Sequence, residues 1–238
     1  LCASYVKSAG GICAAETQEC FVYLYGEYIM DNMEYKAAIF DFDGTIVNSM
    51  PHWEKAIREW GKKYNIDINV DLIRTMMYKK PNEAIDYIDK HYKGINGKKA
   101  FRTMCVRAVK FYITDVKPIS NAAAYLKYLR KNNIKTALLT NCPPFLCKMA
   151  LLRNGMYNLF DEAVFSNSYS VGKDKPDLFL ITAEKLGVNP GDCMVYEDSY
   201  VALSGARAAK MGFTAVLASE NVYSKELIKE ADRVIERY

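Results

Sequence analysis

One apolar stretch that runs directly into a pair of aspartates limits the fold more than any other part of this sequence. Residues 37–40 (AAIF) are all apolar, and Asp41-Phe42-Asp43-Gly44-Thr45 follows them without a break. An uninterrupted apolar run that ends in a turn signal predicts a strand buried on both faces of a parallel sheet. Open α/β sheets bind their ligands at the carboxyl ends of the strands, which is where Asp41 and Asp43 would lie.

The spacing of these two aspartates predicts a cation site. Phe42 separates Asp41 from Asp43, so both carboxylates leave an extended chain on the same side. Neighbouring carboxylates repel each other unless a cation or a shared proton separates them, and oxygen ligands favour Mg²⁺. Gly44 would let the backbone turn sharply and come close to a ligand. The alternative is that the pentapeptide is only a polar turn after a strand.

The segment that follows, residues 48–116, carries only helical patterns. Pro51 opens a helix over residues 51–64, whose apolar residues recur every three or four positions. The same spacing predicts helices over residues 71–78, 81–92 and 98–113. Because it contains no strand pattern, this segment is predicted to be an all-helical insertion.

From Ser120 onward the pattern alternates between strand and helix. The predicted strands are residues 134–140, 163–165, 192–196, 214–217 and 233–235, and the predicted helices are residues 121–132, 145–154, 176–186, 201–211 and 224–231. Ser120 is the predicted N-cap of the first of these helices. Strands that alternate with helices of this length predict an α/β fold, with a parallel sheet and helices on both of its faces.

These patterns predict how the chain divides into domains. Residues 35–47 and 117–238 would form the α/β core, residues 48–116 a helical cap inserted after the first core strand, and residues 1–34 an N-terminal extension. The extension is acidic where the remainder is basic, contains three of the seven cysteines and is assigned no function. Met33 is the expected start if the extension is not part of the natural protein.

The composition argues against several classes of protein. The longest apolar runs fall short of the roughly 18 residues that a membrane-spanning helix needs. The seven cysteines include no Cys-x-x-Cys pair, so we expect no zinc site, and reduced thiols favour a cytoplasmic protein. The net charge of +4 is mild, and the basic residues between Ile46 and Val116, where they are in excess, are not interleaved with aromatic residues as they are in nucleic-acid-binding surfaces. We therefore expect no nucleic-acid partner and no membrane partner, and the choice between a monomer and a homodimer stays open.

Three further strand ends or loops carry polar residues. Thr140 and Asn141 end a predicted strand with good donors to a phosphoryl oxygen. Lys173 precedes a helix start, where a lysine can neutralise developing negative charge. Glu197 and Asp198 end a third strand with paired carboxylates, which repel each other without a cation. Each of these features taken alone has an ordinary explanation as a turn or a solvated surface.

Taken together, the four polar motifs resemble the haloacid dehalogenase superfamily, on its phosphatase side. They are DFDGT at residues 41–45, LLTN ending at Asn141, GKDKPD starting at Gly172 and VYEDS starting at Val195, in that order. The resemblance covers about residues 33–231 of the chain. It implies a Rossmann-like sheet core with a small helical cap between the first two motifs, as in phosphoglycolate phosphatases and β-phosphoglucomutases.

The resemblance implies a role for each residue of the motifs. Asp41 would be the nucleophile that forms an aspartyl phosphate, and Asp43 would protonate the leaving oxygen and then deprotonate water. Thr140 and Asn141 would hold phosphoryl oxygens. Lys173 would offset the charge on Asp41 and on the transferring group.

The resemblance also implies Mg²⁺ as the cofactor. Asp198, with Glu197 beside it, would complete the Mg²⁺ site together with the Asp41 carboxylate and the Asp43 backbone carbonyl. The reaction would be the hydrolysis of a small phosphorylated metabolite, for which phosphoglycolate and sugar phosphates are the natural candidates.

Departures from the family pattern leave alternatives open. Asp174 stands where the third motif usually has a proline, so Lys175 could take the place of Lys173. A sugar phosphomutase similar to β-phosphoglucomutase is the second hypothesis, although the histidine of that class would fall at Trp53, one position after His52. Dehalogenases lack an acid at the position of Asp43, which disfavours halide removal. A non-catalytic binding protein, the third hypothesis, would be expected to have lost one of the motif aspartates.

Overall fold

A parallel sheet of six strands forms the centre of the fold. The computed structural model describes residues 35–78, 81–217 and 225–238, so the predicted extension at residues 1–34 and the predicted helix start at Ser224 lie outside the described residues. The strands are β1 (Ala37–Phe40), β2 (Lys135–Thr140), β3 (Glu162–Phe165), β4 (Cys193–Glu197), β5 (Gly212–Val216) and β6 (Arg233–Ile235). Their spatial order is β3-β2-β1-β4-β5-β6, and every neighbouring pair is parallel. The predicted parallel sheet is confirmed.

The position of β1 in the sheet explains why the predicted polar residues lie at one edge of it. Phe40, the last residue of β1, lies in register with Leu138 of β2 on one side and Tyr196 of β4 on the other. The chain leaves β1 toward one half of the sheet and returns through β4 on the other side. The carboxyl ends of β1 and β4 therefore form the switch point at which sheets of this kind bind their ligands.

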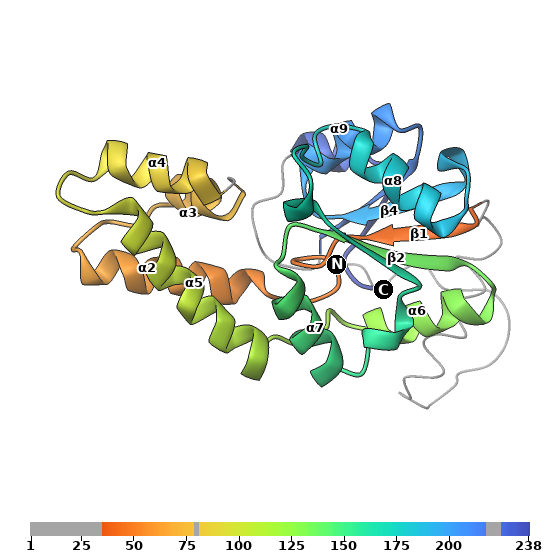
Figure 1. Cartoon of the computed structure of the whole chain (residues 1–238), viewed down its shortest axis with the longest axis horizontal. Helices are drawn as coiled ribbons and strands as arrows, with labels where there is room; N and C mark the ends of the chain where they lie inside the picture. The colour runs from red at the N-terminus through yellow and green to blue at the C-terminus, as the bar shows by residue number, and fades with distance from the viewer. Residues whose placement is uncertain (1–34, 79–80, 218–224) are drawn as a thin grey trace, which may run out of the picture. The chain divides into compact units, whose positions relative to one another are not determined.

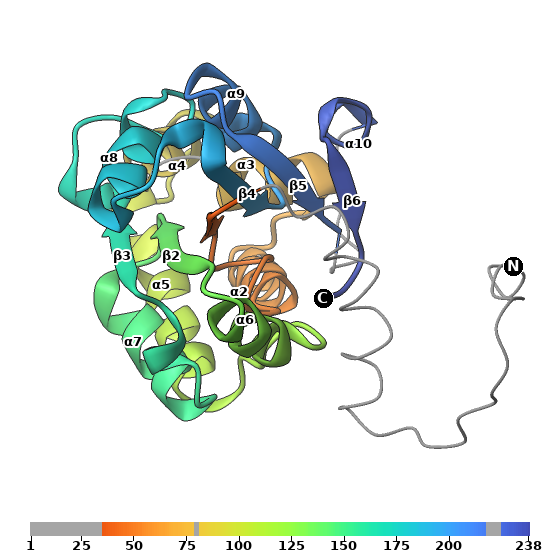
Figure 2. The ribbon, with the colours of Figure 1, turned by 90° about the vertical axis from the view of Figure 1, so that its right-hand side faces the viewer.

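Helices cover both faces of the sheet (Figure 1). They are α6 (Ala122–Lys131), α7 (Pro144–Arg153), α8 (Asp177–Leu186), α9 (Tyr200–Ala208) and α10 (Lys225–Glu230), with short 3-10 turns η1 (Tyr157–Leu159), η2 (Ser166–Ser168) and η3 (Pro190–Asp192). Helices α8 and α9 pack on one face, and α6 packs on the opposite face (Figures 1 and 2). None of the helices in the described ranges is both long and apolar enough to cross a membrane.

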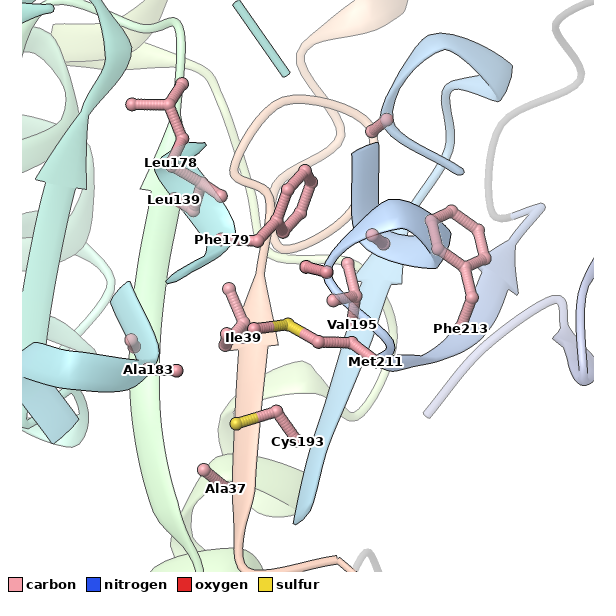
Figure 3. Close-up of a cluster of buried hydrophobic side chains, with 14 of the residues drawn as sticks. Ala37, Ile39, Leu139, Leu178, Phe179, Ala183, Cys193, Val195, Met211 and Phe213 are labelled. Carbon is pink, nitrogen blue, oxygen red and sulfur yellow. The ribbon is translucent and has the colours of Figure 1, made fainter. Parts of the chain in front are cut away.

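The sheet face beneath α8 and α9 carries the main apolar core (Figure 3). Ile39, Leu139 and Val195 point from three neighbouring strands toward Phe179 of α8, and all four side chains are at most 1% exposed. Burying a side chain of this size contributes about 1.5–3 kcal/mol. The packing of α8 and α9 on this face therefore holds the strands that end in polar residues in place.

Four helices lie between β1 and α6 in the sequence. They are α2 (Met50–Lys63), α3 (Val70–Tyr78), α4 (Pro81–His91) and α5 (Gly97–Thr114), and they have an apolar cluster of their own that includes Trp60, Ile88 and Met104. Pro51 lies in the first turn of α2, where its missing N–H has no partner to lose. These four helices agree with the predicted helical insertion after the first strand, and its role as a cap with limits at residues 48 and 116 stays a prediction.

The predicted N-cap of α6 is wrong. The capping position is held by Asn121 and not by Ser120, and Asn121 has the left-handed backbone conformation with φ of 65°. Asparagine adopts this conformation more readily than most residues. The Asn121 side chain donates to the Tyr238 carbonyl oxygen at 3.0 Å, and it makes no capping bond to the helix.

Candidate active site

The loop after β1 brings Asp41 to the end of β4. The Asp41 amide donates to the carbonyl oxygen of Tyr196 at 3.0 Å, which extends the pairing of β1 with β4 by one residue. Gly44 turns the loop back with φ of 84°, and its amide donates to the Val47 carbonyl oxygen at 2.9 Å. A Cβ atom at Gly44 would overlap Oδ2 of Asp198. Glycine is needed here both for the backbone conformation and for the close approach of the Asp198 carboxylate.

Three carboxylates converge at this edge of the sheet. Asp41, Glu197 and Asp198 are buried, and one carboxylate oxygen from each lies within 4.8 Å of the other two. Asp41 comes from the end of β1, whereas Glu197 and Asp198 come from the end of β4. The structure thus brings together three of the four predicted metal ligands through their side chains. Asp43, which was predicted to contribute its backbone carbonyl, follows Asp41 in the same loop.

Lys173 lies among these carboxylates. Its Nζ is 2.5 Å from Oδ1 of Asp41 and 2.8 Å from Oε1 of Glu197, and the residue is only 6% exposed. Lys175, the alternative left open by the sequence, is exposed. On helix α9, Gly205 leaves room for the loop, because a Cβ atom there would overlap the Lys173 carbonyl oxygen. The geometry therefore favours Lys173 over Lys175 as the lysine of the site.

Burial dominates the electrostatics of the acidic cluster. It raises the pKa of Asp41 to about 7; Lys173 opposes this shift, while Glu197 and Asp43 add to it. Burial, followed by the charges of Glu197 and Asp41, also holds the pKa of Asp198 well above its usual range. Burial alone would lower the pKa of Lys173, but the Asp41 and Glu197 carboxylates outweigh it and the net shift is upward, so the ammonium stays charged.

The donor set fits a hard divalent cation. One ammonium cannot neutralise three buried carboxylates, and an additional positive charge would keep Asp41 and Asp198 ionised. Both oxygens of Glu197 already accept hydrogen bonds, from Lys173 and from the Ser199 amide at 2.7 Å. Asp41 and Asp198 are therefore better placed than Glu197 to be direct ligands of such a cation, and their oxygens are the donors that Mg²⁺ prefers.

Thr140 and Asn141 lie at the end of β2, beside β1. The Thr140 hydroxyl accepts from the Cys142 amide at 2.9 Å, so it keeps its own proton for donation. The Asn141 side chain accepts through Oδ1 from the hydroxyl of Ser166. This bond assigns the oxygen side of the amide to Ser166 and turns the NH₂ donors away from it.

Sequence reasoning missed Ser166 and Tyr112. Ser166 directly follows β3, so the rule that selects polar residues at the ends of strands would have found it. The hydroxyl of Tyr112, on helix α5, donates to Oδ1 of Asp43 across 69 residues of sequence. The helical spacing around Tyr112 indicates only a buried face, so no sequence signal pointed to this contact.

A separate cavity lies away from the acidic cluster. It has a volume of about 480 Å³ and runs along α7 and the edge strand β3, with a lining that includes Lys148, Tyr157 and Glu162. None of the motif residues Asp41, Asp43 and Lys173 lines it. The convergence of charged groups, and not the size of a cavity, therefore identifies the candidate active site.

Comparison with known sequences identifies a family. A sequence model described as haloacid dehalogenase-like hydrolase matches residues 35–210. Fructose-1-phosphate phosphatase of Escherichia coli is 27% identical over 185 residues, which are 74% of this chain and 94% of that protein. A phosphorylated carbohydrates phosphatase of Thermotoga maritima is 27% identical over 176 residues, 74% of this chain and 80% of that one.

Solved structures share the fold at lower identity. A hydrolase of the same family from Deinococcus radiodurans superimposes with a TM-score of 0.71 at 20% identity, covering 86% of this chain and 92% of that one. A β-phosphoglucomutase from Clostridium difficile superimposes with a TM-score of 0.67 at 22% identity, covering 85% and 91% of the two chains. At these identities the likeness supports the fold alone.

Proposed function

Because the chain belongs to the haloacid dehalogenase-like hydrolase family, we propose that it is a Mg²⁺-dependent phosphatase that hydrolyses a small phosphorylated metabolite through an aspartyl-phosphate intermediate. That it is a phosphoric monoester hydrolase follows from the family together with the phosphatases among its relatives. The observation that carries the finer proposal is the Lys173 ammonium held between Asp41 and Glu197, with Asp198 beside them.

The proposed substrate class is a sugar phosphate or a compound of the phosphoglycolate type. The relatives include a fructose-1-phosphate phosphatase and a hexitol phosphatase, both from Escherichia coli. These names describe those proteins, and they support a small phosphorylated carbohydrate as the first class to test here.

The first chemical step joins phosphorus to Asp41. A carboxylate oxygen of Asp41 attacks the phosphorus atom, and the bond from phosphorus to the ester oxygen breaks. The Asp43 carboxyl gives its proton to that leaving oxygen. Thr140 and Asn141 hold the phosphoryl oxygens by hydrogen bonds, and the Lys173 ammonium offsets the negative charge of the group in transfer.

The second step restores the protein. The Asp43 carboxylate takes a proton from water as that water attacks phosphorus, and the acyl phosphate bond to Asp41 breaks to release inorganic phosphate. Asp43 thereby regains the proton that the next cycle needs. Bound Mg²⁺, held by Asp41 and Asp198 with Glu197 nearby, would supply the positive charge that lets the Asp41 carboxylate approach an anionic phosphate.

A sugar phosphomutase is the second candidate, because it would use the same core residues. Trp53 occupies the position at which the histidine of that class is expected, and its indole nitrogen donates to Tyr112 at 3.0 Å. His52, the neighbouring histidine, packs its ring against Phe111 with the ring centroids 4.9 Å apart. Neither arrangement favours the mutase over the phosphatase.

Phosphate release tests the proposal. A panel of sugar phosphates, phosphoglycolate and p-nitrophenyl phosphate is incubated with wild-type protein and with Asp41→Asn, in Mg²⁺ and in chelator. We expect release that requires both Mg²⁺ and Asp41, with a loss of about 10⁴-fold or more in the variant. If folded wild-type protein released phosphate from none of the panel, the phosphatase would be overturned. Conversion of a sugar 1-phosphate into the 6-phosphate would then support the mutase.

A further inference from the structure

A chain of two hydrogen bonds joins the helical insertion to Asp43. The indole Nε1 of Trp53, on helix α2, lies 3.0 Å from the hydroxyl oxygen of Tyr112, on helix α5. The same hydroxyl bonds to Oδ1 of Asp43, in the loop after β1. These three side chains come from three separate parts of the chain, and Tyr112, in the middle of the three, is only 1% exposed.

The direction of both bonds follows from the donors available. An indole nitrogen can only donate, so the Tyr112 oxygen accepts from Trp53. The single hydroxyl proton of Tyr112 then points to Oδ1 of Asp43. Because Oδ1 is occupied as an acceptor, the proton that Asp43 carries as a general acid belongs on Oδ2. The bond thus leaves Oδ2 as the carboxyl oxygen that carries the proton.

The two bonds lie near the two chain segments that connect the helical insertion to the sheet. The Asn48 amide donates to the Lys117 carbonyl oxygen at 2.9 Å, so the two connecting segments lie side by side. Trp53 lies in the helix that starts after the first segment, and Tyr112 lies in the helix that ends before the second. A shift of α5 against the sheet would move the Tyr112 hydroxyl relative to Asp43, and a shift of α2 would move Trp53 relative to that hydroxyl.

We propose that Tyr112 is a positioning residue for the general acid Asp43, and that Trp53 fixes the orientation of the Tyr112 hydroxyl. This inference rests on the proposed function, because it assumes that Asp43 protonates the leaving oxygen. It concerns the proton transfers of Asp43, and kcat/KM reports only the first of them. The attack by Asp41 and the binding of the phosphoryl group do not involve Tyr112.

The leaving group provides a readout that distinguishes positioning from a merely structural role. An alkoxide needs a proton as it leaves, whereas p-nitrophenolate is stable as an anion and leaves without one. The ratio kcat/KM reports the steps up to release of this group and excludes the later hydrolysis of the intermediate. Loss of acid positioning therefore lowers kcat/KM for an alkyl phosphate and spares kcat/KM for p-nitrophenyl phosphate.

Tyr112→Phe is the variant to test, because it removes only the hydroxyl. The ring that stacks on Phe42, with centroids 6.3 Å apart, is kept. We expect kcat/KM for the fastest sugar phosphate of the panel to fall about 10-fold, the size of one lost hydrogen bond. The value for p-nitrophenyl phosphate should stay within about 2-fold of wild type, since no proton is required there. Asp43→Asn should give the same pattern with a larger loss.

Tyr125→Phe is the matched control. The Tyr125 hydroxyl is also buried and also has two partners, the hydroxyls of Tyr196 at 2.6 Å and Tyr35 at 3.1 Å. Among the described residues it makes no hydrogen bond to Asp43, so its loss should not discriminate between the two esters. Trp53→Phe serves as a second test, and it should reproduce part of the Tyr112→Phe pattern.

The outcomes separate the two proposals. Equal loss for both esters in Tyr112→Phe and Trp53→Phe, or no loss for either, would overturn the positioning role while wild-type activity and its dependence on Asp41 still supported the phosphatase. If Tyr112→Phe did not fold, the ester pattern of Trp53→Phe would decide. Absence of Asp41-dependent hydrolysis in the wild type would overturn both proposals together.

Discussion

The sheet edge and the helical insertion contribute to the candidate site in different ways. At the sheet edge, Asp41, Lys173 and Asp198 are 6–8% exposed and are held by strands and tight loops. The helices α2–α5 pack around an apolar cluster of their own and reach the catalytic loop through the hydroxyl of Tyr112. In the proposed mechanism the sheet supplies the charges of the reaction, and the insertion positions one acid. Substitutions in the two regions should have separable consequences.

Removing the ammonium of the sheet edge should have the largest effect. Lys173→Met leaves Asp41 and Glu197 buried without their cation, and we expect kcat to fall about 10³-fold. The free energy of unfolding, measured without added metal, should drop by about 3 kcal/mol because a buried pair is broken. Lys175→Met, two residues away and exposed, is the matched control and should change neither quantity. A larger loss of activity in Lys175→Met would show that the catalytic lysine has been assigned wrongly.

Two glycines, one at the sheet edge and one in the helical insertion, allow the two regions to be compared through a change in the backbone. Gly44, in the catalytic loop, has φ of 84°, and Gly94, between α4 and α5, has φ of 81°. A Cβ atom would overlap Asp198 at the first position and would meet nothing within 4 Å at the second. Both alanine variants should lose about 1 kcal/mol of stability from the left-handed conformation, and Gly44→Ala should lose more because the overlap forces Asp198 to move.

Only Gly44→Ala should lose activity, by about 10²-fold, since displacing a carboxylate in a site of this kind is costly. Steady-state kinetics and denaturant unfolding of the two variants measure both effects. Equal activity in Gly44→Ala and Gly94→Ala would show that Asp198 need not lie where the structure has it.

The smallest effect is expected inside the helical insertion. Ile88, in α4, is 0% exposed, and Ile88→Val should cost about 1 kcal/mol by removing one buried methylene. Because the charges of the site belong to the sheet edge, kcat/KM for p-nitrophenyl phosphate should remain within about 2-fold of wild type. Thermal unfolding and kinetics check this. A fall in activity with unchanged stability would contradict the view that the charged groups of the site depend on the sheet edge and not on the core of the helical insertion.

The sheet could be predicted closely because its signal is local. The bounds of β1 at residues 37 and 40 and of β6 at residues 233 and 235 match the prediction. For β1 the reason is that a buried apolar run between turn residues has few alternatives. The start of α6 could not be predicted from the rule for N-caps. Asn121 adopts a left-handed conformation and its side chain bonds to Tyr238, 117 residues further along the chain, a contact that a local capping rule does not include.

The residues of the candidate site also fall into those that could be predicted from the sequence and those that could not. Residues that follow buried strands, such as Asp41 and Asp198, could be selected from the sequence because strand ends meet at one edge of a parallel sheet. The choice between Lys173 and Lys175 required the structure, since both precede the same helix. Tyr112 lies outside this rule, because contacts between a helix and a distant loop depend on packing. The assignment of catalytic roles to all these residues stays a prediction.

The most direct test of the central claim is to trap the phosphorylated protein. Wild-type protein and Asp41→Asn are mixed with the fastest substrate in Mg²⁺, quenched in acid within the first turnover, digested and analysed by mass spectrometry. The account predicts one phosphoryl group on Asp41 in the wild type and none in the variant. Release of phosphate without a phosphorylated protein, or a phosphoryl group on a different residue, would contradict it.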